Sequence, residues 1–190
     1  MSRNAHSFGL MPLTLVLAGL LGMAGSCLAS NDTEALLRTR MQAAAWPSMA
    51  KQQADQYLQA FPDGPAAEQA QAIRQRAEKL AEVLSRREVG LYRPAVLDSA
   101  SNQVLAPDVH AAMSGDAKAA VRLAQALKQT QPYRYVGWLQ LATALGDERA
   151  PYELALFFRS QGQPALAAMY ESQAVAMGFV PPPVLDHARK

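Results

Sequence analysis

The chain has 190 residues, half of them apolar, and a formal net charge of +2. This length suits one domain or two very small ones. Its lysines and arginines are scattered and form no basic patch, which excludes an electrostatic surface for nucleic acid or for a membrane. Alanine and leucine dominate and long β-branched runs are absent. The composition therefore favours an all-α protein.

Residues 1–29 have the layout of a secretory signal peptide. One arginine and no acid precede the apolar stretch FGLMPLTLVLAGLLGMAG, and small residues follow before the polar NDTE. The alternative is a retained membrane anchor, because the apolar run has about the length that spans a bilayer. Pro12, several glycines and the lack of a basic flank favour export instead.

Cys27 is the only cysteine, and its surroundings offer two processing routes. The stretch MAGSC resembles the lipobox of bacterial lipoproteins, which implies a lipid-modified Cys27 as the first mature residue. Ala24 departs from that pattern, where leucine is usual. The other route is ordinary cleavage after Ala29, which discards Cys27. Either route predicts a mature protein that is periplasmic or associated with the outer membrane, where only a lipid at Cys27 would provide a membrane anchor.

Residues 30–86 predict an N-terminal helical hairpin. The polar NDT at 31–33 supplies capping candidates, and an apolar stripe at helical spacing follows. Pro47 predicts a kink or a break, because proline removes a backbone donor and clashes with the preceding turn. The sequence PDGP at 62–65 predicts a turn. A second amphipathic pattern then predicts an antiparallel helix over about 66–86.

Residues 87–107 show no sustained period and predict a connector. Gly90, Pro94 and Pro107 punctuate this stretch. A connector of this length either packs as an ordered strap or separates two units. The sequence therefore predicts a boundary between the hairpin and the residues that follow.

Residues 108–180 contain an internal repeat. The stretch GDAKAAVRLAQALK from Gly115 aligns with GDERAPYELALFFR from Gly146, and QPYRYVGWLQLATALG aligns with QPALAAMYESQAVAMG. Asp116 and Asp147 are predicted to cap helix starts. The glycines at the ends, Gly146 and Gly178, are predicted to terminate helices in a left-handed turn. Proline opens each second helix, and the extra residue of the second unit falls in a turn near Gly162.

The repeated residues are similar to Sel1-like repeats. The residues that carry the resemblance are Trp138, Ala142 and Gly146 in one unit, and Ala167, Tyr170, Ala174 and Gly178 in the next. The resemblance implies a short α-solenoid of about two helix pairs, with residues 181–190 as a C-terminal cap. Two features depart from the pattern: the units are short, and Tyr135 replaces a small residue. Tetratricopeptide repeats are the near alternative, but their final proline is missing.

Catalytic, metal and cofactor sites are not expected. The residues after the predicted signal hold only His110 and His187, with no metal-ligand spacing. His110 is expected on a helix surface and His187 in the solvated tail. No cysteine nucleophile would remain after processing, and the acidic pairs resemble helix starts.

A partner-binding face is predicted on the first helix of each pair, which lines the concave side of Sel1-like arrays. Its residues are Lys118, Arg122 and Gln125 in one unit and Arg149, Glu153 and Leu156 in the next, with Tyr133 as a further accessible side chain. The alternative is an ordinary solvated face. Leu156 and Phe157 make the last unit more apolar, so the C-terminal tail or a partner is expected to cover it.

The sequence thus predicts an exported helical scaffold or adaptor that binds another protein of the bacterial cell envelope. One alternative is an envelope enzyme, or a protein that modulates one, acting on cell-wall material. Another is a small structural lipoprotein whose main role is anchoring. Convergent acids, bases or hydroxyls in one pocket would distinguish the enzyme.

Overall fold

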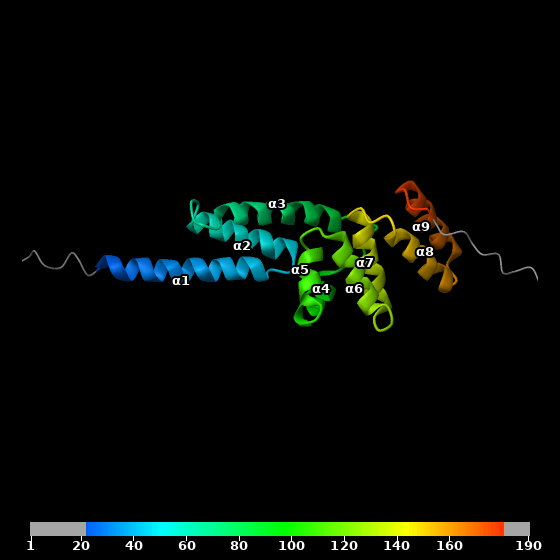
Figure 1. Ribbon diagram of the computed structural model, residues 1–190, viewed down its shortest axis with the longest axis horizontal. Coiled ribbons are helices and arrows are strands. Elements are labelled where there is room, and N and C mark those ends of the chain that lie inside the picture. The colour runs from blue at the N-terminus through cyan, green and yellow to red at the C-terminus, as the bar shows by residue number, and fades with distance from the viewer. Residues whose placement is uncertain (1–21, 181–190) are drawn as a thin grey trace, which may run out of the picture. The chain divides into compact units, whose positions relative to one another are not determined.

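The structure is a computed structural model that describes the backbone of residues 22–180 and the side chains of residues 31–180. These residues form nine α-helices and no strand (Figure 1). The predicted all-α class is therefore confirmed. Most of the predicted signal peptide, residues 1–21, and the predicted cap, residues 181–190, lie outside the described residues.

The chain divides into two compact units, Met1–Leu36 and Leu37–Lys190. Helix α1 (Gly22–Ala43) crosses the boundary between them, and residues 22–36 are the described part of the first unit. Cys27 lies in this helix, and its side chain is among those not described. No described helix is sufficiently long and apolar to cross a bilayer.

The predicted helix start at 31–33 is wrong for this structure. Asn31, Asp32 and Thr33 lie inside α1, which begins at Gly22. Residues 22–30 contain no proline, so each of them keeps the backbone N–H that a continuous helix uses. Capping side chains do not create a helix start where helix-compatible residues precede them.

Helices α2 (Pro47–Ala60) and α3 (Ala67–Leu84) form an antiparallel pair in the second unit. The predicted break is confirmed, since Trp46 is extended, with φ −128° and ψ 137°, and Pro47 opens α2. Lys51 Nζ lies 2.6 Å from Glu78 Oε1, and Asp55 Oδ1 lies 3.9 Å from Arg74 Nη1. The residue numbers of these pairs rise along α2 and fall along α3, as the antiparallel arrangement requires.

A small core closes the turn between α2 and α3. Tyr57 is fully buried, and its hydroxyl accepts a hydrogen bond from the backbone N–H of Ala66 at 3.0 Å. A Cβ placed on Gly64 would lie 2.6 Å from the same hydroxyl, so this turn requires glycine. The buried members of this hairpin cluster are Met41, Ala54, Tyr57, Ala66 and Ala70.

The stretch predicted as a connector, residues 87–107, contains regular structure. Helix α4 (Arg93–Ser101) and the first two residues of α5 (Ala106–Ala112) fall within it. Pro94 and Pro107 occupy the first turns of these helices, where a missing N–H costs no hydrogen bond. The residues before α4 form an ordered strap: Val89 and Leu91 are buried, and the N–H of Gly90 donates to Gln140 Oε1 at 2.8 Å.

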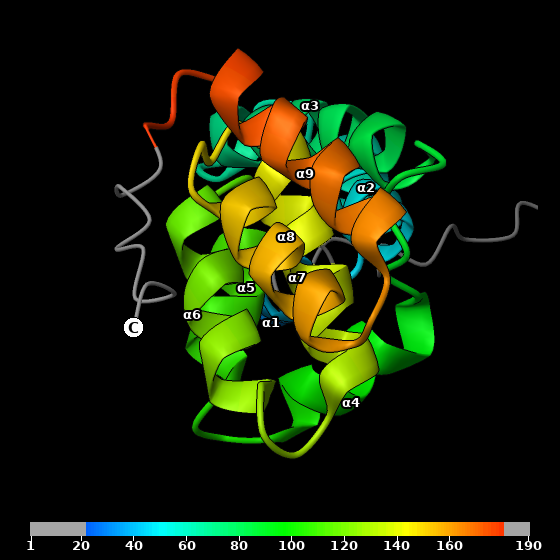
Figure 2. The ribbon, with the colours of Figure 1, turned by 90° about the vertical axis from the view of Figure 1, so that its right-hand side faces the viewer.

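The four remaining helices are α6 (Ala117–Leu127), α7 (Pro132–Ala144), α8 (Ala150–Ser160) and α9 (Pro164–Ala176). Each packs against the next along the chain, and α5 packs against α6. Figure 2 shows α8 beside both α7 and α9. Proline opens both second helices as predicted.

The Gly-Asp pairs stop one helix and start the next, as the repeat predicted. Gly115 and Gly146, the glycines of the two pairs, have φ of 99° and 97°, which favours glycine. Gly178, which follows α9, has φ of 98°. Oδ1 of Asp147 accepts hydrogen bonds from the N–H groups of Arg149 and Ala150, at 3.0 and 2.8 Å. Asp116 accepts the equivalent bonds at the start of α6. Gly162 also has a positive φ, 68°, where the second unit carries its extra residue.

The main core lies around α7, whose side chains are buried on several faces. Trp138, Leu139 and Leu141 are fully buried. Small residues at Ala124, Ala142 and Ala155 are also fully buried, which is consistent with close approach of neighbouring helices. Because α6 and α8 both pack against α7, the core holds in place the surface that these two helices form with the residues directly after α9.

Candidate functional site

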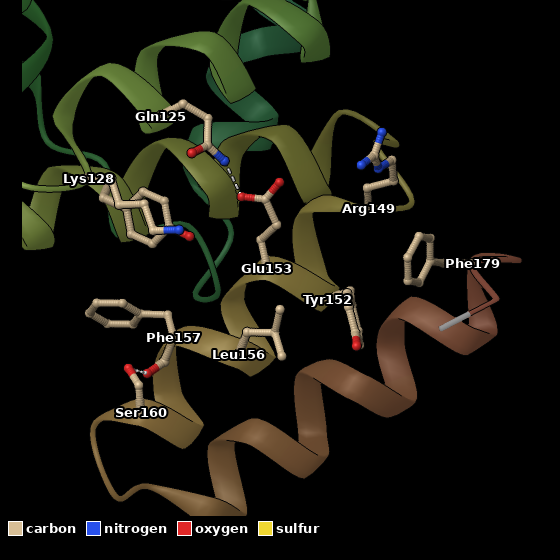
Figure 3. Close-up of a pocket in the computed structure, with 10 residues that line it drawn as sticks. Gln125, Lys128, Arg149, Tyr152, Glu153, Leu156, Phe157, Ser160 and Phe179 are labelled. Atoms are coloured by element: carbon tan, nitrogen blue, oxygen red, sulfur yellow. Dashed lines mark hydrogen bonds between the residues drawn. The ribbon is translucent and has the colours of Figure 1, made fainter. Parts of the chain in front are cut away.

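The structure brings together four residues of the predicted partner-binding face. Gln125 on α6 and Arg149, Glu153 and Leu156 at the start and along α8 line one pocket of about 560 Å³. Figure 3 shows their side chains around a common opening. We call this hollow the α6–α8 pocket; its lining residues are Gln125, Lys128, Tyr135, Arg149, Tyr152, Glu153, Leu156, Phe157, Ser160 and Phe179.

Aromatic and aliphatic side chains form much of the pocket wall. The ring of Phe179, after the last helix, lies 4.9 Å from the ring of Tyr152, centroid to centroid. The rings of Tyr135 and Phe157 are 5.4 Å apart. Between these pairs, Leu156 keeps 45% of its surface exposed. Such a lining can hold an apolar group and remove it from water.

Glu153 is engaged by its neighbours inside the pocket. Its carboxylate accepts a hydrogen bond from the side-chain amide of Gln125, which links α6 to α8 (Figure 3). Burial raises the pKa of Tyr135 to about 12, and the charge of Glu153 and a hydrogen bond to it add to this effect. The phenol therefore stays neutral at physiological pH, and Glu153 acts as an acceptor for groups of its own chain.

Two cations lie at the same pocket. The ammonium of Lys128 lies 5.6 Å from the centre of the Tyr135 ring. Arg149 is exposed at the start of α8. Within the described residues neither side chain has an ion pair, so both charges are available to a ligand.

The other predicted face residues lie elsewhere. Arg122 is held by Asp108 at the start of α5, with Nε and Nη2 at 2.9 and 2.6 Å from one carboxylate oxygen. This contact raises the pKa of Arg122. Lys118 is exposed on α6 and does not line the α6–α8 pocket.

Tyr133 is 92% exposed, as predicted, and lines a different hollow of about 430 Å³ with Tyr92. The hollow also includes Gln140, whose amide oxygen accepts from Gly90 and whose amide nitrogen donates to the Tyr170 hydroxyl at 3.0 Å. Tyr133 is therefore accessible but does not share the site of the other predicted residues.

His110 is half-buried and lines a further hollow with Met41 and Met113, so it is less exposed than the sequence indicated. His187 lies outside the described residues. Among residues 31–180, no three histidine, cysteine or carboxylate side chains are grouped as a metal site.

Several lining residues had only weak signals in the sequence. Tyr152 and Leu156 are four residues apart and share a helix face, so the spacing could have indicated an apolar stripe. Lys128 and Ser160 end their helices and have no distinctive pattern. Phe179 follows the last repeat glycine, and only the fold shows that it reaches Tyr152.

Comparison with known proteins adds no family assignment. No protein-family model matches the chain, and no curated protein or solved structure is significantly similar to it.

Proposed function

We propose that this chain is an exported scaffold with Sel1-like helix pairs, arranged as a short solenoid, that binds another protein of the bacterial cell envelope. The signal-like residues 1–29 support export. The Sel1-like assignment rests on the sequence repeat, in which GDAKAAVRLAQALK aligns with GDERAPYELALFFR. Asp116 and Asp147, which are equivalent in that alignment, both accept backbone hydrogen bonds at helix starts.

The α6–α8 pocket carries the binding part of the proposal. It combines an apolar wall with charged groups at its edge, and it lies where the repeat pattern predicted a partner. Binding sites commonly pair a desolvated apolar centre with polar groups that fix orientation. An envelope enzyme stays the alternative, and convergent acids, bases or hydroxyls in one pocket would distinguish it.

Site-specific photo-crosslinking in cells tests the binding proposal. A photoreactive phenylalanine analogue at Leu156 should capture a defined second protein, because this side chain lies at the centre of the pocket wall. The same analogue at Glu82, exposed on α3, is the matched control. Absence of any Leu156-specific adduct, with normal protein levels, would contradict the proposal.

Cell fractionation tests the export route. If Cys27 is lipidated, Cys27→Ser should move the protein from the membrane fraction to the soluble periplasmic fraction. If cleavage follows Ala29, the variant should fractionate like the wild type. Cytoplasmic retention of the wild-type protein, measured by protease protection in spheroplasts, would contradict export.

A further inference from the structure

We infer that the α6–α8 pocket selects an acidic peptide segment, in which an apolar side chain inserts into the pocket and flanking Asp or Glu residues reach Lys128 and Arg149. This inference rests on the proposed protein-binding function and specifies the chemistry of the partner. Three observations support it: the apolar wall, the hydrogen bond that Glu153 already accepts, and the lack of an ion pair for Lys128 and Arg149 among residues 31–180.

The apolar wall sets the position of the anchor. Leu156 is nearly half exposed between the Tyr152–Phe179 and Tyr135–Phe157 ring pairs. The pocket volume of about 560 Å³ leaves room for a leucine or phenylalanine side chain and some of its backbone. An anchor inserted here would cover apolar surface on α8 that no described residue covers.

The charges set the preference for acidic flanks. Figure 3 shows Lys128 and Arg149 on opposite sides of Glu153. Glu153 already accepts from Gln125 and interacts with Tyr135, whereas neither cation has an ion pair among residues 31–180. The nearby Arg159 differs, because its Nη2 is 2.7 Å from Glu171 Oε2. Within the part of the chain that the structure describes, the pocket edge therefore has two cations without an ion pair and one carboxylate that already accepts a hydrogen bond.

The acidic flanks and the apolar anchor are expected to contribute unequally to the affinity of the peptide. Exposed ion pairs contribute little to binding free energy, so the acidic flanks would tune affinity and orientation. The buried anchor would supply most of the affinity, as central apolar contacts do in protein interfaces. A basic peptide with the same anchor would instead place like charges beside Lys128 and Arg149.

Fluorescence anisotropy with the full chain tests this inference. The probe is a labelled peptide, capped at both ends, with Phe-Leu flanked on each side by two glutamates. Matched peptides replace every glutamate by glutamine or by lysine. We expect the glutamate peptide to bind about fivefold more tightly than the glutamine peptide at low salt, and the lysine peptide to bind least. The difference should shrink as salt is added.

Variants separate the two contributions. Lys128→Glu combined with Arg149→Glu should reverse the order of the glutamate and lysine peptides. Leu156→Ser should weaken the glutamate and glutamine peptides alike. Lys118→Glu is the control, since this exposed lysine on α6 changes the net charge without altering the pocket. Circular dichroism verifies that each variant is folded.

Four outcomes would overturn the inference. Equal binding of the glutamate and glutamine peptides would remove the charge selection, as would an equal effect of Lys118→Glu and the double variant. Self-association that Leu156→Ser abolishes would assign the pocket to a second copy of the chain. If photo-crosslinking at Leu156 captures a protein but no acidic peptide binds, the proposed function stands and this inference fails. If an acidic peptide binds but photo-crosslinking captures no cellular protein, this inference stands and the proposed function fails.

Discussion

At the residue scale, the aspartates of the two Gly-Asp pairs are the clearest link between sequence and structure. Asp116 and Asp147 each accept two backbone hydrogen bonds at the start of a helix. We expect Asp147→Ala to lower the free energy of unfolding by about 1 kcal/mol, because two N–H groups lose their acceptor. Urea denaturation measures this change.

The matched variant Asp147→Asn separates hydrogen bonding from charge. Asparagine keeps an acceptor oxygen but lacks the charge that favours a helix start. It should therefore retain more stability than Asp147→Ala. If Asp147→Asn and Asp147→Ala were equally unstable, the hydrogen bonds would not be the cause.

Tyr135 should make stability depend on alkaline pH. Its pKa in the folded chain is about 12, above the ordinary value of 10.0, chiefly because the phenol is buried. The unfolded chain therefore loses this proton first, and the stability linked to Tyr135 is intact below pH 10 and is lost as the pH rises toward 12.

Urea denaturation of wild type and Tyr135→Phe at several pH values measures that loss. The difference in unfolding free energy between them should change between pH 9 and pH 12, in the direction that favours the variant at high pH. Tyr133→Phe is the control, because this side chain is 92% exposed. Parallel profiles of wild type and Tyr135→Phe would contradict the interpretation.

At the element scale, small residues should limit how closely the helices pack. Ala142 on α7 is fully buried in the main core, whereas Ala176 at the end of α9 is exposed. We expect Ala142→Leu to destabilise the protein by about 1–3 kcal/mol, since a larger side chain forces its neighbours apart. Ala176→Leu should leave the midpoint of thermal unfolding almost unchanged. Similar effects at both positions would argue against tight packing around α7.

The same scale shows why some helices were predictable and others were not. The starts and ends of α6 to α9 follow local chemistry, since Asp147, Gly146 and Pro132 each act within a few residues. Pro94 and Pro107 are ambiguous in sequence, because proline both breaks helices and opens them. The structure resolves the ambiguity, since residues such as Val96 and Val109 bury one side of α4 and α5 in the main core.

The sequence predicted four of the ten residues that line the α6–α8 pocket, because only contacts within a helix can be read from local spacing. Gln125 on α6 and Arg149, Glu153 and Leu156 at α8 were predicted from the outward positions of the first helix in each repeat, as the Sel1-like resemblance implies. Arg122 has the same spacing but is held by Asp108, a contact between α5 and α6 that only the fold brings together. The apolar stripe could suggest Tyr152, but the contribution of Phe179 depends on where the chain returns after α9.

At the scale of the whole molecule, buried residues of the second unit form two clusters linked by α3. The hairpin cluster contains Tyr57 and Ala70, and the main cluster contains Leu80, Trp138 and Leu139. Ala70 and Leu80 both belong to α3. Because few buried residues join the clusters, local opening of the hairpin need not disrupt the helices around α7.

Hydrogen exchange measured by mass spectrometry tests this separation. Tyr57→Ala removes a fully buried ring and the acceptor of the Ala66 N–H, so we expect a local loss of about 3–5 kcal/mol. Exchange should accelerate in α2 and in the first half of α3, while α6 to α8 keep their protection. Leu139→Ala, in the main cluster, is the counterpart and should accelerate exchange in α6, α7 and α8. If Tyr57→Ala accelerated exchange equally in all these helices, the two clusters would unfold as one cooperative unit. In that case α3 would transmit the loss of the hairpin core to α7.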